Sequence, residues 1–275
     1  MIRADMKHKY LYLLLPLCAV SSAGAATTMG GVTLGPISGL GANSTFAIWN
    51  TMNGWHATAN PNGLAGTGSF PGTTMWAPQN SQPGSNESNT KLVKVSNGVG
   101  GGPYAASGSV YYGGFSGTPN LNGGTLSLSN ASPLDNLQTV LFQIQIGEAA
   151  TYDFHNHVLP VMSYTLVGDV TLHTLAAAAS SNYHKLDNGT IEMPTGTEPL
   201  YINSYAMWFD FSEIAGDVES FSVSWTGVQH AQLYGVSLQQ DDVAASGAIL
   251  PVAVPEPSAV LLGGIGFLFL LRRRK

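Results

Sequence analysis

The sequence predicts an all-β protein, an antiparallel β-sandwich that is jelly-roll-like, and three observations indicate this class. Apolar and β-branched runs recur along residues 133–242 at roughly 10–15-residue spacing. No alternation of strands with long helical patterns accompanies them. Twenty-one of the 33 glycines fall between Gly30 and Gly124, a density that favours turns over helices. The predicted β body therefore spans residues 29–242.

The second half of the body, residues 133–242, holds the most regular strands. Ser220–Trp225 places Phe221, Val223 and Trp225 on one face and three serines on the other, as in a half-solvated antiparallel strand. Gly168-Asp169 separates two apolar runs at hairpin spacing. Leu175–Ser180 is the one helix-compatible piece. The predicted strands are Thr139–Ile146, Val161–Val167, Val170–Leu175, Ala206–Phe211, Ser220–Trp225 and Gln232–Leu238.

The first half of the body, residues 29–132, is rich in Gly, Asn, Ser and Pro, which predicts long loops between short strands. After the body, residues 243–253 have small side chains and a proline, as in a linker that lifts the domain from a membrane. The strands expected in the first half are Thr45–Trp49, Lys91–Val95, Ser109–Phe115 and Thr125–Ser129.

The charge of the body excludes one class of partner. Seven of the ten basic residues lie near the two ends of the chain, so the body keeps three lysines and no arginine against fourteen acidic residues, a formal charge of −11. Phosphate-backbone binding needs clustered cations. We therefore expect no nucleic-acid partner.

The N-terminus has the three parts of a secretory signal peptide, residues 1–25. Arg3, Lys7 and Lys9 precede an apolar stretch of about eleven residues, Tyr10–Val20, which is too short to span a membrane as a helix. Ala23-Gly24-Ala25 follows as an A-x-A cleavage site, so we expect a signal helix that the Sec translocon and signal peptidase handle. The only cysteine, Cys18, lies in this segment, which leaves the mature body without a disulfide.

The C-terminus, residues 254–275, combines three features in a fixed order. Pro255-Glu256-Pro257 comes first, a thirteen-residue apolar stretch (Ala259–Leu271) follows, and Arg272-Arg273-Arg274-Lys275 ends the chain. The stretch predicts a short transmembrane helix, and the basic cluster would stay in the cytoplasm. The prolines keep the tripeptide extended and outside that helix. An ordinary single-pass anchor would place the body on the same side of the membrane.

This tail closely resembles the PEP-CTERM sorting signal of exopolysaccharide-producing Gram-negative bacteria. The resemblance implies that an exosortase, a membrane transpeptidase, recognises Pro255, Glu256 and Pro257 together with Arg272, Arg273 and Arg274. It also implies that the protein is anchored in the inner membrane by its tail before processing, and then goes to the cell surface or the extracellular (biofilm) matrix. The resemblance covers about 22 residues and says nothing of the activity of the body.

Two short clusters of metal-ligating residues are candidate metal sites. On a strand, Asp153, His155 and His157 would point to one side and present one carboxylate and two imidazoles to a divalent metal. The alternative is a polar strand end before Pro160. Asp241-Asp242, after the last predicted strand, would offer hard oxygen ligands to calcium, and the alternative there is a solvated acidic turn.

Three tryptophans in loop-rich segments, Trp49, Trp55 and Trp76, are candidates for carbohydrate binding. Exposed indole rings stack on sugar C–H faces while neighbouring amides bind hydroxyls. The alternative is that each ring closes one end of the sandwich core.

The sequence contains no G-x-S-x-G elbow, H-E-x-x-H motif, phosphate loop or mature cysteine nucleophile. We therefore predict a non-catalytic surface or matrix protein that binds exopolysaccharide. The alternatives are a glycan-processing enzyme on the same scaffold and a purely structural coat or biofilm component.

Overall fold

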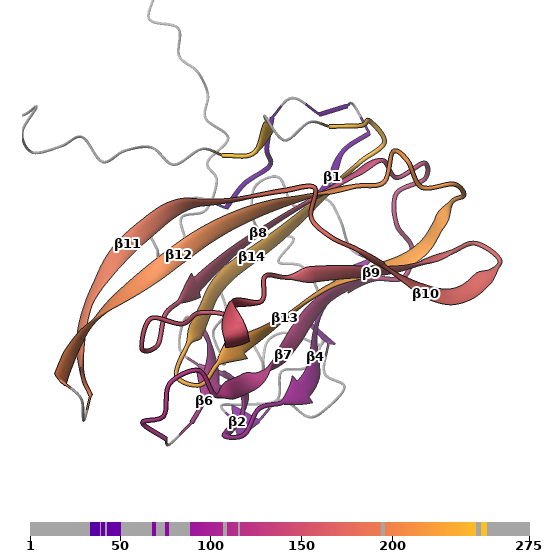
Figure 1. Ribbon diagram of the computed structural model, residues 1–275. Helices are drawn as coiled ribbons and strands as arrows, with labels where there is room; N and C mark the ends of the chain where they lie inside the picture. Colours follow the sequence, from indigo (N-terminus) through magenta and orange to yellow (C-terminus); the bar gives the residue numbers. More distant parts are fainter. Residues whose placement is uncertain are drawn as a thin grey trace, which may run out of the picture.

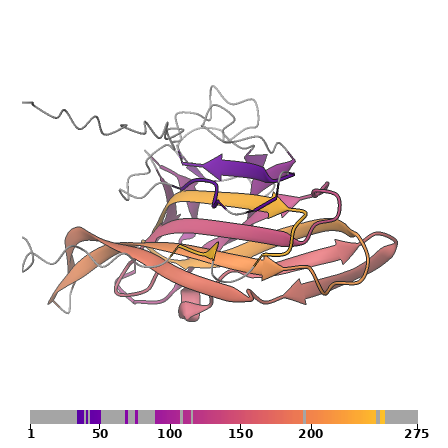
Figure 2. The ribbon, with the colours of Figure 1, turned by 90° about the horizontal axis from the view of Figure 1, so that it is seen from above.

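Two antiparallel sheets pack against each other in the computed structural model, and this arrangement confirms the predicted β-sandwich (Figures 1 and 2). The jelly-roll topology stays a prediction. The signal segment, the tail and Trp55 lie outside the described residues. The structure describes residues 34–38, 40–41, 43–50, 68–69, 75–76, 89–106, 109–114, 116–193, 196–245 and 249–251.

The larger sheet has the strand order β11-β12-β8-β14-β6-β5-β2. One edge of β14 pairs with β8, while the other pairs with β6 through Gln232 and Leu233 and with β1 further along, from Val236 to Gln240. Its strands are β1 (Thr45–Trp49), β2 (Gly68–Ser69), β5 (Gly101–Ala105), β6 (Val110–Gly113), β8 (Thr139–Gly147), β11 (Ala179–Met193), β12 (Gly196–Asp210) and β14 (Gln232–Asp241).

The smaller sheet has the order β10-β9-β13-β7-β4-β3. The predicted hairpin is present, with Val167 and Gly168 in its turn. The predicted serine face is also confirmed, because Phe221, Val223 and Trp225 are buried while the serines between them are half-exposed. Its strands are β3 (Met75–Trp76), β4 (Thr90–Asn97), β7 (Asn122–Asn130), β9 (Val161–Leu166), β10 (Asp169–Leu175) and β13 (Val218–Val228).

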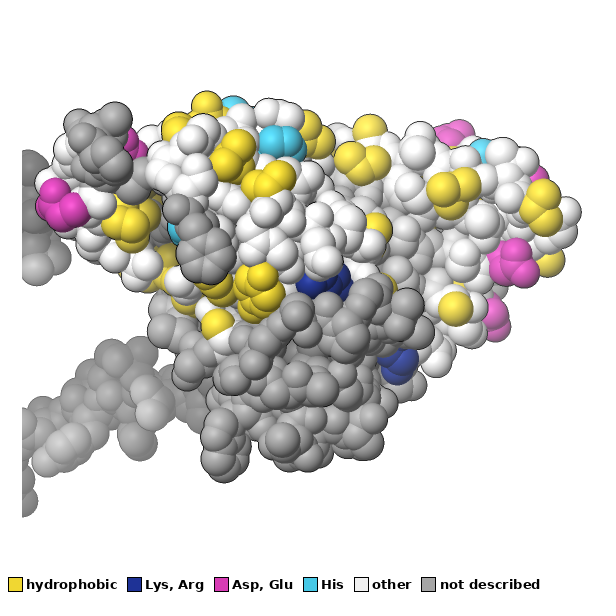
Figure 3. Space-filling view, turned by 90° about the horizontal axis from the view of Figure 1, so that it is seen from below, with side chains coloured by type: hydrophobic (Ala, Val, Ile, Leu, Met, Phe, Trp, Pro, Cys, Tyr) yellow, Lys and Arg dark blue, Asp and Glu magenta, His cyan; other side chains and the backbone are white. Residues whose placement is uncertain are grey.

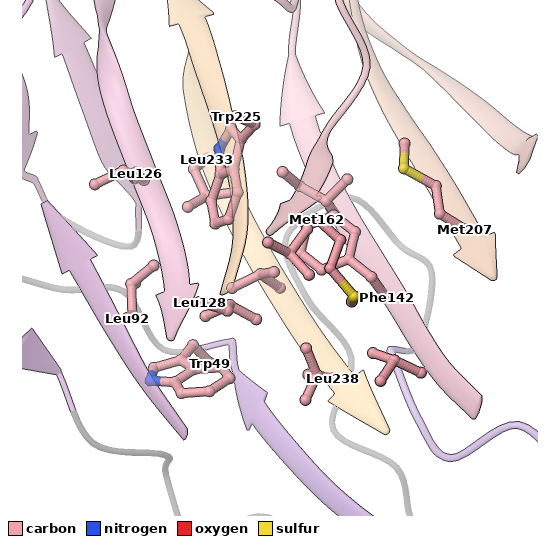
Figure 4. Close-up of a cluster of buried hydrophobic side chains, with 14 of the residues drawn as sticks. Trp49, Leu92, Leu126, Leu128, Phe142, Met162, Met207, Trp225, Leu233 and Leu238 are labelled. Atoms are coloured by element: carbon pink, nitrogen blue, oxygen red, sulfur yellow. The ribbon is translucent and has the colours of Figure 1, made fainter. Parts of the chain in front are cut away.

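The main hydrophobic core contains residues from both sheets. Alternate residues of β8, such as Phe142 and Ile144, join Leu126 and Leu128 of β7 and Trp225 of β13 in one buried cluster (Figure 4). The ring centroids of Phe142 and Trp225 lie 5.5 Å apart, so the inner faces of the two sheets are in contact at this aromatic pair.

Segments from both ends of the body cover the outer face of β8 and β14. Gln143 donates to the backbone oxygen of Gly35, and Gln239 exchanges hydrogen bonds with the backbone of Ile37. This cover explains why all nine residues of β8 are buried. Polar side chains of β8 and β14 thus bind the backbone of the N-terminal segment.

The prediction of a free linker is wrong for the described residues of 243–251. Thr139 donates to the Val243 backbone oxygen at 2.8 Å and accepts from the Ala245 N–H at 3.0 Å. Leu250, 6% exposed, packs with Leu141, Tyr183 and Ala206. Ile249 and Leu250 pack against the outer face of the sheet, and the burial of their apolar side chains stabilises this contact.

The β11–β12 hairpin is longer than the sequence suggested. The prediction placed a strand only at Ala206–Phe211, but β11 and β12 pair from Ala179↔Trp208 to Met193↔Gly196. Leu175–Ser180, predicted as helix-compatible, instead ends β10 and begins β11. In Figure 1 the hairpin extends well past the other strands of its sheet. Its distal half therefore forms one wall of a cleft.

Candidate functional site

A cleft of about 620 Å³ lies at the end of the larger sheet. The distal half of the β11–β12 hairpin forms one wall, with Asn188, Ile191, Glu192 and Leu200. The loop 116–120 faces it, and the ends of β6, β8 and β14 supply the remaining surface. Its volume is typical of small-molecule sites.

Aromatic rings and amides make up much of the lining of the cleft. Tyr111 of β6 and His230 contribute half-buried rings, Tyr234 of β14 is only 6% exposed, and Gln229 and Gln232 contribute amides. Burial raises the pKa of both tyrosines, so their hydroxyls stay protonated at neutral pH. The cleft therefore offers flat apolar surfaces next to neutral hydrogen-bonding groups.

The imidazole of His230 fixes the hydroxyl of Tyr111. Nε2 of His230 lies 2.9 Å from the Ser116 backbone oxygen, and Nδ1 lies 2.7 Å from the Tyr111 hydroxyl. Because a carbonyl oxygen only accepts, Nε2 carries the proton of the neutral ring. Nδ1 then accepts, so the Tyr111 hydroxyl donates to it and turns its lone pairs elsewhere.

The backbone around the cleft is strained. Asn120, Ala150 and His230, all lining residues, have φ of 56°, 50° and 69°, and Thr151 beside them has 68°. A β-branched residue such as threonine rarely takes positive φ. Left-handed conformations at non-glycine residues cost of order 1–3 kcal/mol each and cluster at ligand sites, where the surrounding contacts hold them.

A buried polar network supports the cleft from behind. Glu148, at the cleft, accepts from Lys185 at 2.8 Å and from Asn203 at 2.7 Å through the same carboxylate oxygen. Asn203 also donates to Asp153 at 3.0 Å, and Tyr205 donates to Asp153 at 2.6 Å. Burial and the nearby Asp153 carboxylate raise the pKa of the Tyr205 hydroxyl. The network connects the 148–154 loop to β11 and β12.

The strand that was predicted to bring Asp153, His155 and His157 to one side is absent. These residues do not lie on a strand, because His155–His157 forms a 3-10 turn (η1) in which Asn156 and His157 have φ of 56°. Asp153 is buried and satisfied by Asn203 and Tyr205, whereas exposed His157 stacks on Tyr152. Within the described ranges, no three His, Cys, Asp or Glu side chains are grouped to hold a metal ion.

The carboxylates of Asp241-Asp242, predicted as calcium ligands, accept hydrogen bonds from neighbouring segments. Asp241, fully buried, accepts from the backbone N–H of Gly41 at 3.0 Å and of Val243 at 2.8 Å. Asp242 accepts from the Asn43 amide. A carboxylate that accepts N–H bonds keeps further lone pairs, so a calcium site at this pair stays a prediction. The pair fastens the N-terminal segment to the end of β14.

Of the three tryptophans proposed for carbohydrate binding, only Trp49 has a described side chain, and it contradicts the prediction. Trp49 is 0% exposed in the main core, near Leu92 and Leu128 (Figure 4). Trp55 and the side chain of Trp76 lie outside the described residues. The half-buried aromatic rings that line the cleft belong to Tyr111 and His230.

Sequence reasoning missed the residues of the cleft. Gln229 and His230 lie in the short stretch between the last two predicted strands, and this position is the one local signal available. Nothing in the sequence indicated that Tyr111 and the distal β11–β12 hairpin would meet them, because these segments are up to about 120 residues apart.

The PEP-CTERM protein-sorting motif is present at the C-terminus, over residues 253–275. This finding confirms the resemblance drawn from the tail. PEP-CTERM proteins are exported and sorted to the cell surface, and the motif implies processing by an exosortase. The chain thus combines a β-sandwich domain with a C-terminal PEP-CTERM sorting motif. No curated protein and no solved structure matches it.

In the described part of the chain, no helix is both long and apolar enough to cross a membrane. The tail itself, with Pro255, Glu256, Pro257 and the three arginines, lies outside that part, as do Ala23 and Ala25 of the predicted signal cleavage site.

Proposed function

We propose that the protein is a non-catalytic cell-surface or matrix protein that binds polysaccharide in the cleft between the β11–β12 hairpin and the 116–120 loop. The cleft, with two tyrosine rings beside amide side chains, is the observation that carries this proposal. Sugar rings present apolar C–H faces to aromatic rings and hydroxyls to amides. The sorting motif supports it, since the resemblance implies an exopolysaccharide-producing cell.

The proposed itinerary begins with export through the Sec translocon and signal peptide removal at Ala25. The tail then anchors the protein in the inner membrane until the exosortase acts, after which the body reaches the cell surface or matrix. The largely uncharged face in Figure 3, with few basic side chains, suits contact with a hydrated, hydroxyl-rich polymer.

A second candidate function is glycan hydrolysis, since Glu148 and Glu192 both line the cleft. Glycosidases use two carboxylates that flank the bond to be cleaved. Here Glu148 is held by Lys185 and Asn203, and exposed Glu192 accepts from Thr197 at 2.7 Å. Because both carboxylates are engaged by protein donors, we favour binding over catalysis.

Binding is tested with the mature protein on an array of bacterial and plant polysaccharides, followed by titration of any glycan that binds. Tyr111→Ala and Tyr234→Ala should each weaken binding about tenfold by removing a stacking surface. Tyr152→Ala, a ring outside the cleft lining, is the matched control.

Absence of binding to every polysaccharide would show that the proposal is wrong. Release of reducing ends that depends on Glu148 and Glu192 would instead establish the enzyme. Circular dichroism of each variant shows whether the sandwich remains folded.

A further inference from the structure

We infer that the ligand of the cleft is an amine-bearing glycan, a polymer containing hexosamines with free amino groups. The inference rests on the proposed function and narrows its ligand class. It comes from the hydrogen-bonding groups that the protein leaves unpaired in the cleft, and from the sign of the charges there.

Unpaired acceptors collect in the cleft. The proton of the Tyr111 hydroxyl is committed to Nδ1 of His230, so this oxygen presents only lone pairs to a ligand. Gln229 also lines the cleft, and its Oε1 has no hydrogen-bond partner within the described residues, but this atom is itself buried, so a ligand reaches it only after the side chain moves. One carboxylate oxygen of Glu148 takes both protein donors, which leaves the second without a donor from the described chain.

A buried acceptor without a donor costs free energy, and a ligand that donates removes this cost. Hydroxyls of any sugar donate one hydrogen bond each, whereas an ammonium group donates three and carries a charge. The set of acceptors therefore favours an amine over an acetamide at the same ring position, because acetylation removes donors and charge together.

The acidic side chains at the cleft have the charge opposite to that of an ammonium group. Glu148 and Glu192 line it, and no lysine or arginine does among the described residues. Lys185 is close to the network but pairs with Glu148 at 2.8 Å and lies over the Tyr201 ring, 4.1 Å from its centroid. The body as a whole has a formal charge of −11. Uronate-rich or sulfated polymers would meet repulsion here, and amines attraction.

The rings add to this preference. Tyr111, half-buried, lines the same cleft as the carboxylates, whereas the Tyr234 ring is only 6% exposed. A cation over an aromatic face gains attraction that a neutral acetamide lacks. Stacking, hydrogen bonding and charge thus all select the same ligand class.

The experiment compares four probes on the full mature protein by calorimetric titration: a glucosamine hexasaccharide, its N-acetylated form, cellohexaose and a polyuronate oligomer. We expect the glucosamine oligomer to bind about tenfold more tightly than the acetylated one, and added salt to weaken it selectively. Glu192→Gln should weaken its binding about threefold, since an exposed charge pair contributes modestly. Glu219→Gln, an exposed residue near the start of β13 and outside the cleft, is the matched control and should change nothing.

Glu148→Gln serves as a second variant whose folding is checked by thermal denaturation, because Glu148 also holds Lys185. Equal or tighter binding of the acetylated or neutral oligomer would overturn the amine inference and leave the proposed polysaccharide function standing. Tightest binding of the polyuronate would also overturn it. No binding by any of the probes, with none on the polysaccharide array, would show that both are wrong.

Discussion

The carboxylate of Asp153 is 6% exposed and accepts hydrogen bonds from Asn203, Tyr205 and the backbone N–H of Phe154. A buried carboxylate is stable only when donors replace its lost water. In the sequence, Asp153 precedes two histidines and predicts a metal ligand. Its actual donors come from β12, about 50 residues further on, so its local neighbours could not reveal its role.

Removal of one donor tests this role at the level of a single atom. Tyr205→Phe should lower the free energy of unfolding by about 1–3 kcal/mol, because hydrogen bonds to a charged group are among the stronger ones. Urea denaturation measures the change. Tyr201→Phe on the same strand, whose hydroxyl makes no hydrogen bond to the described chain, should be close to neutral. Equal stability of both variants would contradict the structural role of the Tyr205–Asp153 contact.

Among the elements, the β9–β10 hairpin contains a titratable turn of its own. The backbone N–H of Thr171 donates to Asp169 at 2.8 Å, and His173 lies 3.1 Å from the other carboxylate oxygen. Hydrogen bonds from Thr171, with a smaller contribution from His173, lower the pKa of Asp169 to about 2. The folded hairpin therefore favours the ionised carboxylate.

Because the pKa of Asp169 is depressed on folding, its stabilising contribution is present above the unfolded value of about 4 and is lost as pH falls toward 2. We expect the amide of Thr171 to exchange faster with solvent below about pH 4, with an NMR titration midpoint for Asp169 near 2. Asp169→Asn should keep an acceptor for Thr171 and abolish the titration. A midpoint close to 4 in the native protein would show that these hydrogen bonds do not persist in solution.

The β11–β12 hairpin shows that a sequence pattern can detect one part of a strand and miss another. Its inner half, near Ala206 and Phe209, consists mostly of buried residues, and its apolar part was predicted as a strand. The distal half is exposed on much of its surface, so no apolar alternation marks it, and hydrogen bonding between the two strands maintains it instead. That distal half forms a wall of the cleft, so the site was missed along with it.

At the scale of the whole molecule, the folded body ends close to the sorting motif. Pro251 is the last described residue, Leu250 before it is buried, and three residues separate Pro251 from Pro255. An extended chain spans at most about 3.6 Å per residue. An exosortase must therefore work next to the face of the larger sheet on which both terminal segments pack, unless residues 243–251 first detach.

Sorting of the whole protein is expected to depend on Glu256 in the C-terminal motif. We expect Glu256→Ala to leave export intact but to block processing, so that the full-length precursor stays in the inner membrane. Membrane fractionation with mass determination of the C-terminus measures this. Glu219→Ala, an exposed acid on the body, should be processed normally. Normal release of the Glu256→Ala protein to the surface would contradict recognition of this tripeptide.

The amino-acid sequence alone was enough to identify the sorting signal and to predict the class of fold. The tail is recognised from linear order alone, since its proline element, apolar stretch and basic cluster act in the order in which they are written. Ser220–Trp225 was found because its alternation of burial is encoded locally, and Thr45–Trp49 because it is a short apolar run, four of whose residues are buried. The absence of arginine from the body was also plain in the sequence, and it bears directly on the ligand class.

The tertiary structure alone decided which residues meet. Trp49 is buried in the core because β1 pairs with β14, and Tyr111, His230 and Glu148 share a cleft because β6, β8 and β14 are neighbours in one sheet. Pairing of strands distant in sequence depends on the packing of the entire sheet, which no local pattern specifies. Residue types therefore predicted the surface chemistry, while sheet order determined where on the molecule the cleft forms.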